Sequence, residues 1–234
     1  MEHIFSGFSG PWVAILQIIA IDLVLSGDNA VVIALACRNL PAAQRRQGVF
    51  WGVVGAVGLR VVLTAFAATL LGYPYLKLAG GVVLLWIGVK LMLPEQGNGD
   101  DVAAPDRLWA AVRTVITADL VMSIDNVIAV AAAARDSLIL MVFGLAVSIP
   151  LIVWSAQWVM WAMERWPFVV AAGAGLLGYV GGEMAVADPL VVAWLNGIPP
   201  PAYLGGLAGA VLVVGIGWFL GRRTSQGSRE LPRP

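Results

Sequence analysis

The chain has 234 residues, a mean hydropathy of +0.87 and equal numbers of acidic and basic side chains, 14 of each. Charged residues make up only 12% of the sequence, whereas a soluble domain carries about 25%. This composition excludes an ordinary soluble protein, and the zero net charge gives no sign of nucleic-acid binding. We therefore expect an all-α membrane protein in contact with the lipid bilayer.

Seven stretches are long and apolar enough to cross a bilayer as helices. Helices are expected instead of a β-barrel because each stretch is continuously apolar, and a helix satisfies its own backbone hydrogen bonds in lipid. The first stretch carries two Asp residues and no preceding basic region, so we expect no cleaved signal peptide. The stretches cover residues 11–37, 48–71, 74–93, 109–134, 137–163, 167–187 and 202–221.

The first and fourth stretches carry two copies of one acidic motif. It reads DLVLSGDN at residues 22–29 and DLVMSIDN at residues 119–126. Each Asp at the centre of a membrane helix costs about 2.5 to 3.5 kcal/mol, and residues that unfavourable usually mark an ion or proton path. The motif supplies the candidate metal ligands Asp22, Asp28, Asn29, Asp119, Asp125 and Asn126, with Ser26 and Ser123 as weaker candidates.

The two motifs belong to a longer internal repeat. Asp22 and Arg38 recur as Asp119 and Arg135, 97 positions later, and further glycine and proline positions recur at an offset of 93. Each unit has three spans, and an odd number inverts the second unit in the membrane, as in many transporters. We predict a three-helix repeat (1–93), a cytoplasmic linker (94–107), an inverted three-helix repeat (108–187), and a seventh helix with a basic tail (188–234).

The spacing within the motif limits its chemistry. On a straight helix Asp22 and Asp28 lie about 120° apart and about 9 Å along the axis, so both cannot face one ion. Either the two acids have different tasks, or the helix unwinds near Ser26 and Gly27. The second copy has Ile124 in place of Gly27, which argues against a break there.

The donor atoms of the motif restrict the ligand. Carboxylate, amide and hydroxyl oxygens suit Mg²⁺, Mn²⁺ and Ca²⁺, and no Cys or His lies nearby to favour softer metals. Clustered carboxylates repel one another, so some would hold protons until a metal enters. The expected partners are a divalent cation as cargo and protons as the coupling ion, with no resident cofactor.

Two further charged residues within the spans are candidates for function. Arg60, in the second span, is either a counter-ion that neutralises the acidic motifs when no metal is bound, or a member of a fixed structural ion pair. Glu183 is a candidate gate or proton acceptor at the outer mouth. Glycine pairs are expected at sites of close helix packing, as in Gly48 with Gly52 and Gly205 with Gly209.

Basic residues between the spans orient the chain. They fall on one side if the N-terminus is outside and the C-terminus is cytoplasmic, in accord with the positive-inside rule. We therefore expect a multi-pass protein of the cell (inner or plasma) membrane, and its number of copies stays open. The residues that set this orientation are Arg38, Arg45, Arg46, Lys90, Arg107, Arg165, Arg222, Arg223, Arg229 and Arg233.

The doubled DLV-[LM]-S-x-DN motif, the run from Val31 to Pro41 and the GYVGGEM stretch at 178–184 carry a resemblance. They are similar to the TerC family of integral membrane proteins, in particular its YjbE-like branch, within the LysE superfamily. The resemblance implies a multi-span protein linked with tellurite resistance and with Mn²⁺ efflux. The family's acidic positions fall on Asp22, Asp28, Asp119 and Asp125, with Asn29 and Asn126 completing each motif.

The function expected from these observations is export of a divalent cation, Mn²⁺ being favoured, in exchange for protons. An enzyme or assembly factor is disfavoured because no catalytic signature is present. A LysE-like exporter of a small organic solute would leave the carboxylate of its cargo unpaired among four acids. A tellurite or stress-resistance membrane scaffold is a further alternative, and a polar network that merely holds helices together is the structural alternative for the motif.

Overall fold

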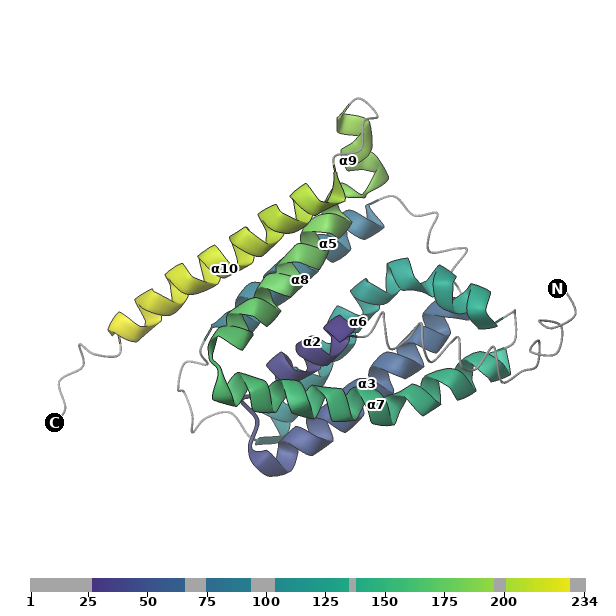
Figure 1. Cartoon of the computed structure of the whole chain (residues 1–234), viewed down its shortest axis with the longest axis horizontal. Coiled ribbons are helices and arrows are strands. Elements are labelled where there is room, and N and C mark those ends of the chain that lie inside the picture. Colours follow the sequence, from purple (N-terminus) through teal and green to yellow (C-terminus); the bar gives the residue numbers. More distant parts are fainter. Residues whose placement is uncertain (1–26, 66–74, 94–103, 135–137, 196–200, 228–234) are drawn as a thin grey trace, which may run out of the picture.

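The computed structural model describes residues 27–65, 75–93, 104–134, 138–195 and 201–227. These residues form helices and no strand, which confirms the predicted all-α class (Figure 1). The helices in this part of the chain are α2 (Gly27–Cys37), α3 (Ala42–Ala65), α5 (Leu76–Met92), α6 (Ala104–Ala134), α7 (Leu138–Arg165), α8 (Phe168–Val186), α9 (Pro189–Trp194) and α10 (Ala202–Gly227).

Among the described residues, α3, α7, α8 and α10 are long and apolar enough to cross a membrane, and the protein is a multi-pass membrane protein. The apolar segments are Ala42–Thr64, Val142–Arg165, Phe168–Val186 and Ala202–Arg222. Helix α5 has 17 residues and falls just short of this length. The stretches 11–37 and 109–134 lie partly outside the described residues or side chains. Seven spans therefore stay a prediction.

Two helix starts differ from the expected spans, and one short helix was not expected. Helix α3 begins at Ala42, six residues before the expected start at residue 48. Helix α6 begins at Ala104, within the predicted linker 94–107, and has Asp106 in its first turn, where a carboxylate complements the helix dipole. Helix α9 was not predicted. It begins with Asp188 as N-cap and Pro189 in its first turn, a combination that favours a helix start.

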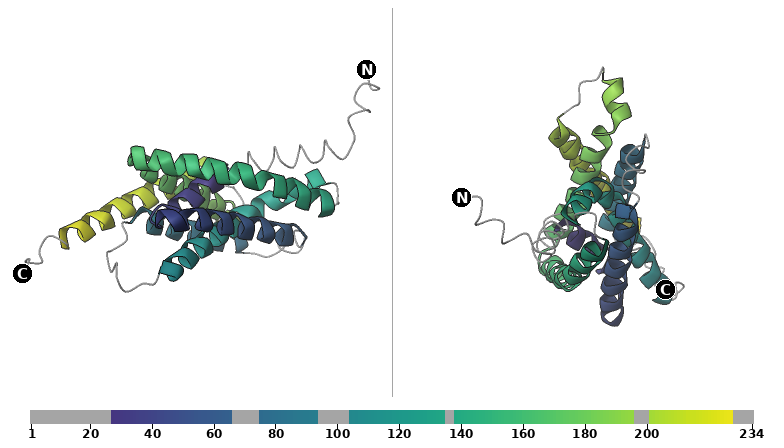
Figure 2. Two further views of the ribbon diagram at one scale, coloured as in Figure 1. Left: turned by 90° about the horizontal axis from the view of Figure 1, so that it is seen from below. Right: turned by 90° about the vertical axis from the view of Figure 1, so that its right-hand side faces the viewer.

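The helices pack in two groups (Figure 1). One consists of α5, α8 and α10, with α8 in extensive contact with both others, and the second consists of α2, α3, α6 and α7. In the second group α2 lies between α7 and α3 (Figure 2). Contacts of α5 with α6 and of α2 with α8 join the two groups. Each group therefore contains helices from both predicted repeats.

Glycines bring α8 and α10 into direct backbone contact. A methyl group at Gly182 would collide with the carbonyl of Gly205, and one at Gly209 would collide with the carbonyl of Gly178. Small residues allow such close approach in membranes, where packing and not the hydrophobic effect drives helix association. The close-packing role predicted for Gly205 and Gly209 is confirmed.

Helices α5 and α8 also come into close backbone contact, and they run in opposite directions. A methyl group at Gly81 would lie 2.5 Å from the carbonyl oxygen of Gly181, and one at Gly88 would lie 3.3 Å from the carbonyl oxygen of Ala174. As the contact moves seven residues forward along α5, it moves seven residues backward along α8. The two helices are therefore antiparallel.

In the second group, α3 packs along α6 through its glycines. A methyl group at Gly52 would lie 3.1 Å from Val115, and one at Gly55 would lie 2.5 Å from Ile116. A methyl group at Gly48 would lie 3.1 Å from Cys37 of α2 and 3.4 Å from Leu108 of α6, so the close-packing prediction also holds for Gly48 and Gly52. Fully buried apolar side chains fill the spaces between these elements, among them Leu35, Val49, Val53, Val115 and Leu145.

Candidate functional site: a buried ion pair between two motifs

The described part of the second motif surrounds a buried arginine. The guanidinium of Arg60 in α3 donates from Nη2 to Asp119 Oδ1 at 2.6 Å and from Nε to Ser123 Oγ at 3.1 Å. The Ser123 hydroxyl in turn donates to Asp119 Oδ2 at 3.2 Å. All three side chains are at most 4% exposed. The result is a closed hydrogen-bonded triangle in which one positive charge balances one negative charge.

Local sequence explains how the three side chains meet. Asp119 and Ser123 are four residues apart on α6 and therefore project from one face of the helix. Gly52 and Gly55 let α3 approach that face closely, and Arg60 lies one to two turns further along α3. Helix α6 continues through Ile124 to Ala134 without a break. The second motif is thus on an unbroken helix, as the Ile in place of Gly suggested.

Asp28 places the first motif near this site. It lies on α2, which contacts α6, and the charges of both Arg60 and Asp119 act on its carboxyl group. The backbone N–H of Asn29 donates to Asp28 Oδ1 at 2.9 Å, and Asn29 itself is only 5% exposed. One acid from each motif therefore shares the field of a single arginine.

The remaining motif residues are not placed. Asp22 and Ser26 lie outside the described residues, and the side chains of Asp125 and Asn126 lie outside the described side chains of α6. Among the side chains that the structure describes, no group of three or more His, Cys, Asp or Glu residues could hold a metal ion. The six-residue metal site stays a prediction.

Glu183 does not join the Arg60 triangle in the described part of the chain. Its carboxylate lies near the side chain of Tyr179, one turn earlier on α8. The Tyr179 ring packs against Gly206 of α10, so this pair lies where α8 faces α10. A role of Glu183 as an outer gate stays a prediction.

One fully buried carboxylate was missed by the sequence analysis. Asp188 Oδ1 accepts from the backbone N–H of Leu190 at 2.9 Å, and its Oδ2 accepts from the N–H of Leu78 at 3.1 Å. It therefore caps α9 and ties the end of α8 to the first turn of α5. The dipeptide Asp188–Pro189 was the available signal, because Asp and Pro favour the N-cap and first helical positions.

Comparison with known proteins places the chain among integral membrane proteins. The profile of the integral membrane protein TerC family matches residues 9–226. The membrane protein YjbE of Bacillus subtilis (strain 168) is 47% identical over 176 residues, covering 75% of this chain and 80% of YjbE. The inner membrane protein YgdQ of Escherichia coli (strain K12) is 24% identical over 198 residues, covering 76% of this chain and 83% of YgdQ.

A shorter similarity links the chain to a resistance protein. The tellurium resistance protein TerC of Alcaligenes sp is 34% identical over 85 residues, which cover 35% of this chain and 24% of that protein. No solved structure matches the chain. Because the family profile spans almost the whole chain and YjbE is similar over four fifths of its own length, this chain belongs to the TerC family of integral membrane proteins.

Proposed function

We propose that this protein is a secondary transporter that exports a divalent metal cation, with Mn²⁺ as the favoured cargo. It is not an enzyme and needs no resident cofactor. The observation that carries the proposal is the buried pair of Asp119 and Arg60, with Asp28 of the other motif in the field of both charges. The proposed ligands are Asp22, Asp28, Asn29, Asp119, Asp125 and Asn126, supported by Ser26 and Ser123.

The contacts between α5 and α8 support an inverted repeat. A shift of 93 positions carries Gly81 onto Ala174 and Gly88 onto Gly181. The contact of Gly81 with Gly181 therefore corresponds to the contact of Ala174 with Gly88, and both occur. Two antiparallel helices that exchange in this way are related by a two-fold axis perpendicular to them. Such an axis lies in the membrane plane when the helices span the membrane, which is the arrangement of inverted transporter repeats.

The other helix contacts follow the same exchange. The first predicted repeat contains α2, α3 and α5, and these correspond to α6, α7 and α8 of the second. The contact of α2 with α7 therefore corresponds to the contact of α6 with α3, and both are present. Likewise α2 packs on α8 as α6 packs on α5. The acidic motifs on α2 and α6 then lie beside the pseudo-symmetry axis, where transporters of this type bind their cargo.

Arg60 gives the empty site its charge balance. A buried carboxylate without a partner is unfavourable by several kcal/mol, and an arginine remains charged at every accessible pH. We therefore assign Arg60 as the internal counter-ion of Asp119. An arriving divalent cation competes with the guanidinium for the Asp119 oxygens and must displace it to bind them. Binding of cargo is thereby coupled to a movement between α3 and α6.

The orientation with the N-terminus outside and the C-terminus cytoplasmic rests on the distribution of arginine and lysine. The name of YgdQ, an inner membrane protein, supports a location in the inner or plasma membrane. The proposed direction of transport, from the cytoplasm outward, comes from the metal efflux that the family resemblance implies. The number of copies in the assembly is left to measurement.

The direct test is ion flux. The purified full-length protein is reconstituted in liposomes that contain a Mn²⁺-sensitive dye, and influx down a gradient is followed. Asp28→Asn and Asp125→Asn should abolish the flux, because each removes a charge without changing volume. Asp106→Asn, on an exposed residue of α6, should leave it intact. Unchanged flux in both motif variants would refute the site, and a flat trace beside active amino-acid flux would favour the organic-solute exporter.

Proton coupling has a separate test. Protons and metal compete for the same oxygens, so Mn²⁺ should bind more weakly as the pH falls, and binding should release protons. Titration of the detergent-purified protein with Mn²⁺ at several pH values measures both. Binding that is independent of pH would mean that the empty acids are already ionised and balanced by Arg60. In that case Arg60→Gln should introduce a pH dependence that the parent lacks.

A second candidate function is supported by the name of one relative. The similarity to the tellurium resistance protein of Alcaligenes sp covers only 85 residues. In this alternative the protein is a membrane scaffold that confers tellurite or stress resistance, and cation transport is not its main task. The distinguishing result would be tellurite tolerance that requires the protein and persists in Asp28→Asn and Asp125→Asn, together with the absence of Mn²⁺ flux.

A further inference from the structure

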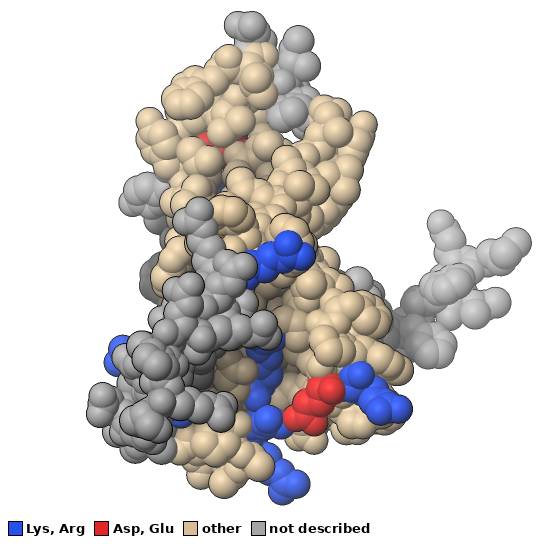
Figure 3. Space-filling model, turned by 90° about the vertical axis from the view of Figure 1, so that its left-hand side faces the viewer, with Lys and Arg blue, Asp and Glu red and all other residues tan. Residues whose placement is uncertain are grey.

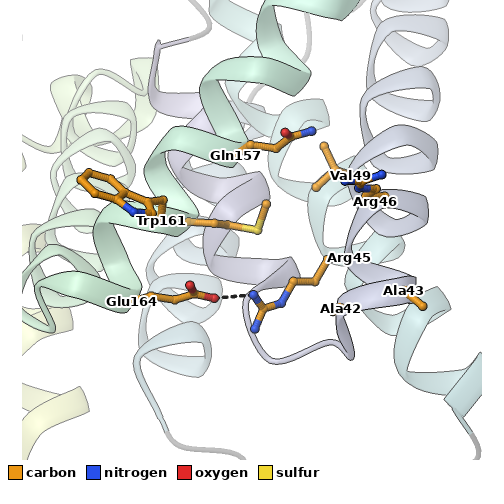
Figure 4. Close-up of a pocket in the computed structure, with 9 residues that line it drawn as sticks. Ala42, Ala43, Arg45, Arg46, Val49, Gln157, Trp161 and Glu164 are labelled. Carbon is orange, nitrogen blue, oxygen red and sulfur yellow. Dashed lines mark hydrogen bonds and ion pairs between the residues drawn. The ribbon is translucent and has the colours of Figure 1, made fainter.

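A polar cavity lies between α3 and α7, away from the Arg60 triangle. It has a volume of about 590 Å³ and is lined by Arg45, Arg46, Gln157, Trp161 and Glu164 among others. Arg46 and Val49 face it from α3, and Gln157 points toward them from α7 (Figure 4). On this side of the molecule, basic side chains gather along a hollow with an acidic group beside them (Figure 3).

The charges in the cavity favour an anion. Arg45 forms an ion pair with Glu164 across the two helices, and its Nε also donates to the Leu40 carbonyl at 3.0 Å. This pair leaves Arg46 as the unbalanced charge among the lining residues. Two guanidinium groups and one carboxylate give the lining a net charge of +1. Such a lining repels a metal cation, so the cavity is distinct from the proposed cation site.

The cavity continues into an aromatic groove on the outside of α7. This groove has a volume of about 330 Å³, is lined by Trp154, Trp158, Gln157 and Trp161, and shares the last two with the polar cavity. Neighbouring indoles pack edge to face at 5.8 Å between ring centroids. All three indoles are more than half exposed. The groove is thus an apolar surface that begins at a charged pocket.

The depth of the groove differs from that of an ordinary interfacial aromatic belt. Belt tryptophans lie at the level of the lipid headgroups. Glu164, at the polar end, and Trp154, at the far end, are ten residues apart, which corresponds to about 15 Å along a helix. That is about half of the hydrocarbon thickness of a bilayer. The aromatic surface is therefore long enough to lie beside one acyl chain.

We infer that this cavity and groove form a binding site for one anionic phospholipid. The phosphodiester accepts hydrogen bonds from Arg46 near the polar end of the cavity, and an acyl chain lies along Trp161, Trp158 and Trp154. Arginine suits this task because its planar guanidinium donates two parallel hydrogen bonds to phosphate. Basic pockets between membrane helices bind lipid headgroups in the same manner. The ligand bridges α3 and α7, which belong to different predicted repeats.

The test measures lipid retained by the full-length protein in detergent, without any metal. Native mass spectrometry compares dioleoyl phosphatidylglycerol with the phosphatidylcholine and phosphatidylethanolamine of the same chains. The parent protein should retain phosphatidylglycerol preferentially. Arg46→Gln should weaken that retention about tenfold, because one charge-assisted contact is lost. Arg113→Gln, the same change at an exposed site of α6, should have no effect.

Two further arms identify the source of the phosphate and the role of the groove. Millimolar inorganic phosphate should not displace the lipid, and Trp158→Leu should reduce the preference for dioleoyl over dihexanoyl phosphatidylglycerol. Equal retention of all three headgroups, or equal effects of Arg46→Gln and Arg113→Gln, would overturn the inference. Displacement by inorganic phosphate would overturn it in favour of a free-phosphate site. None of these outcomes depends on metal transport.

Discussion

The two groups of helices are held together by different chemistry. In α5, α8 and α10 the contacts are between backbones, with Gly182 against Gly205 and Gly178 against Gly209. In α2, α3, α6 and α7 the central contact is between ionised side chains, Arg60 and Asp119. Helices in direct backbone contact can pack in only one way. A charged side chain, in contrast, can exchange one ionic partner for another. We therefore propose that the glycine-packed group is the frame and that the polar group is the part that would respond to the proposed cargo.

This division does not follow the predicted repeats. The frame takes α5 from the first repeat and α8 from the second, and the polar group takes the other two helices of each. A ligand that moves α3 relative to α6 therefore shifts one helix of each repeat, while α5 and α8 hold the repeats together. Four substitutions test the comparison, in order of decreasing expected effect.

The largest effect is expected at Arg60. Replacing it by Met leaves Asp119 buried without its counter-ion, and breaking a buried pair from one side costs about 3 to 5 kcal/mol. The free energy of unfolding, measured by denaturant titration in detergent, should fall accordingly. The double variant Arg60→Met/Asp119→Leu should recover most of this loss, since neither charge is then left. A double variant no more stable than the single one would show that the pair is not what stabilises this group.

The next effect concerns the frame. Gly182→Ala places a methyl group against the backbone of Gly205, and overpacking of this kind costs about 1 to 3 kcal/mol, occasionally more. Gly215→Ala is the matched control on α10, because nothing lies within 4 Å of the added group. The control should keep the melting temperature in detergent or raise it slightly. Equal losses in both variants would mean that helix flexibility, and not contact between α8 and α10, explains the glycines.

Much of the frame was predictable from the sequence because lipid restricts the choices. Continuous apolar stretches must be helices, and repeated small residues indicate where such helices touch. Gly205 and Gly209 were identified in this way. Helix α9 was missed because its six residues are too short for any periodic pattern. Its start signal, Asp188 followed by Pro189, is local chemistry that a search for long spans overlooks.

The residues of the buried Arg60–Asp119 pair could be marked from the sequence, but their pairing could not. The repeated motif marked Asp28 and Asp119, and the position of Arg60 within a span marked it as a counter-ion or as a member of a structural ion pair. Arg60 and Asp119 are 59 residues apart, and four acids were equally available as its partner. Which acid pairs with Arg60 depends on the axial position of α3 relative to α6. Tertiary contacts such as that of Gly52 with Val115 set this position. No local sequence pattern encodes that register.

A third substitution tests a polar contact within the frame itself. Asp188→Ala removes the acceptor for the N–H groups of Leu190 and Leu78, and loss of such a cap costs about 1 to 2 kcal/mol. Asp188→Asn keeps one acceptor oxygen and should lose about half as much. The readout is the free energy of unfolding in detergent. If Asp188→Ala were neutral, α5 and α8 would be held by their glycines alone.

The smallest effect is expected at Ser123, whose hydroxyl connects residues of two helices. Ser148 is the comparison, because its hydroxyl bonds within its own helix. Ser123 accepts from Arg60 and donates to Asp119, whereas Ser148, equally buried, donates only to the Leu145 carbonyl of its own helix. Ser123→Ala should cost about 1 to 3 kcal/mol, at the lower end of that range, because the Arg60 Nε–H loses its acceptor while the ion pair persists. Ser148→Ala removes a donor whose acceptor keeps its helical hydrogen-bonding position, so it should cost less than Ser123→Ala. Both variants are compared by denaturant titration in the same detergent. Equal costs would show that the hydroxyl contributes only to its own helix, and that the polar group is stabilised by the Arg60–Asp119 charges without a connected network.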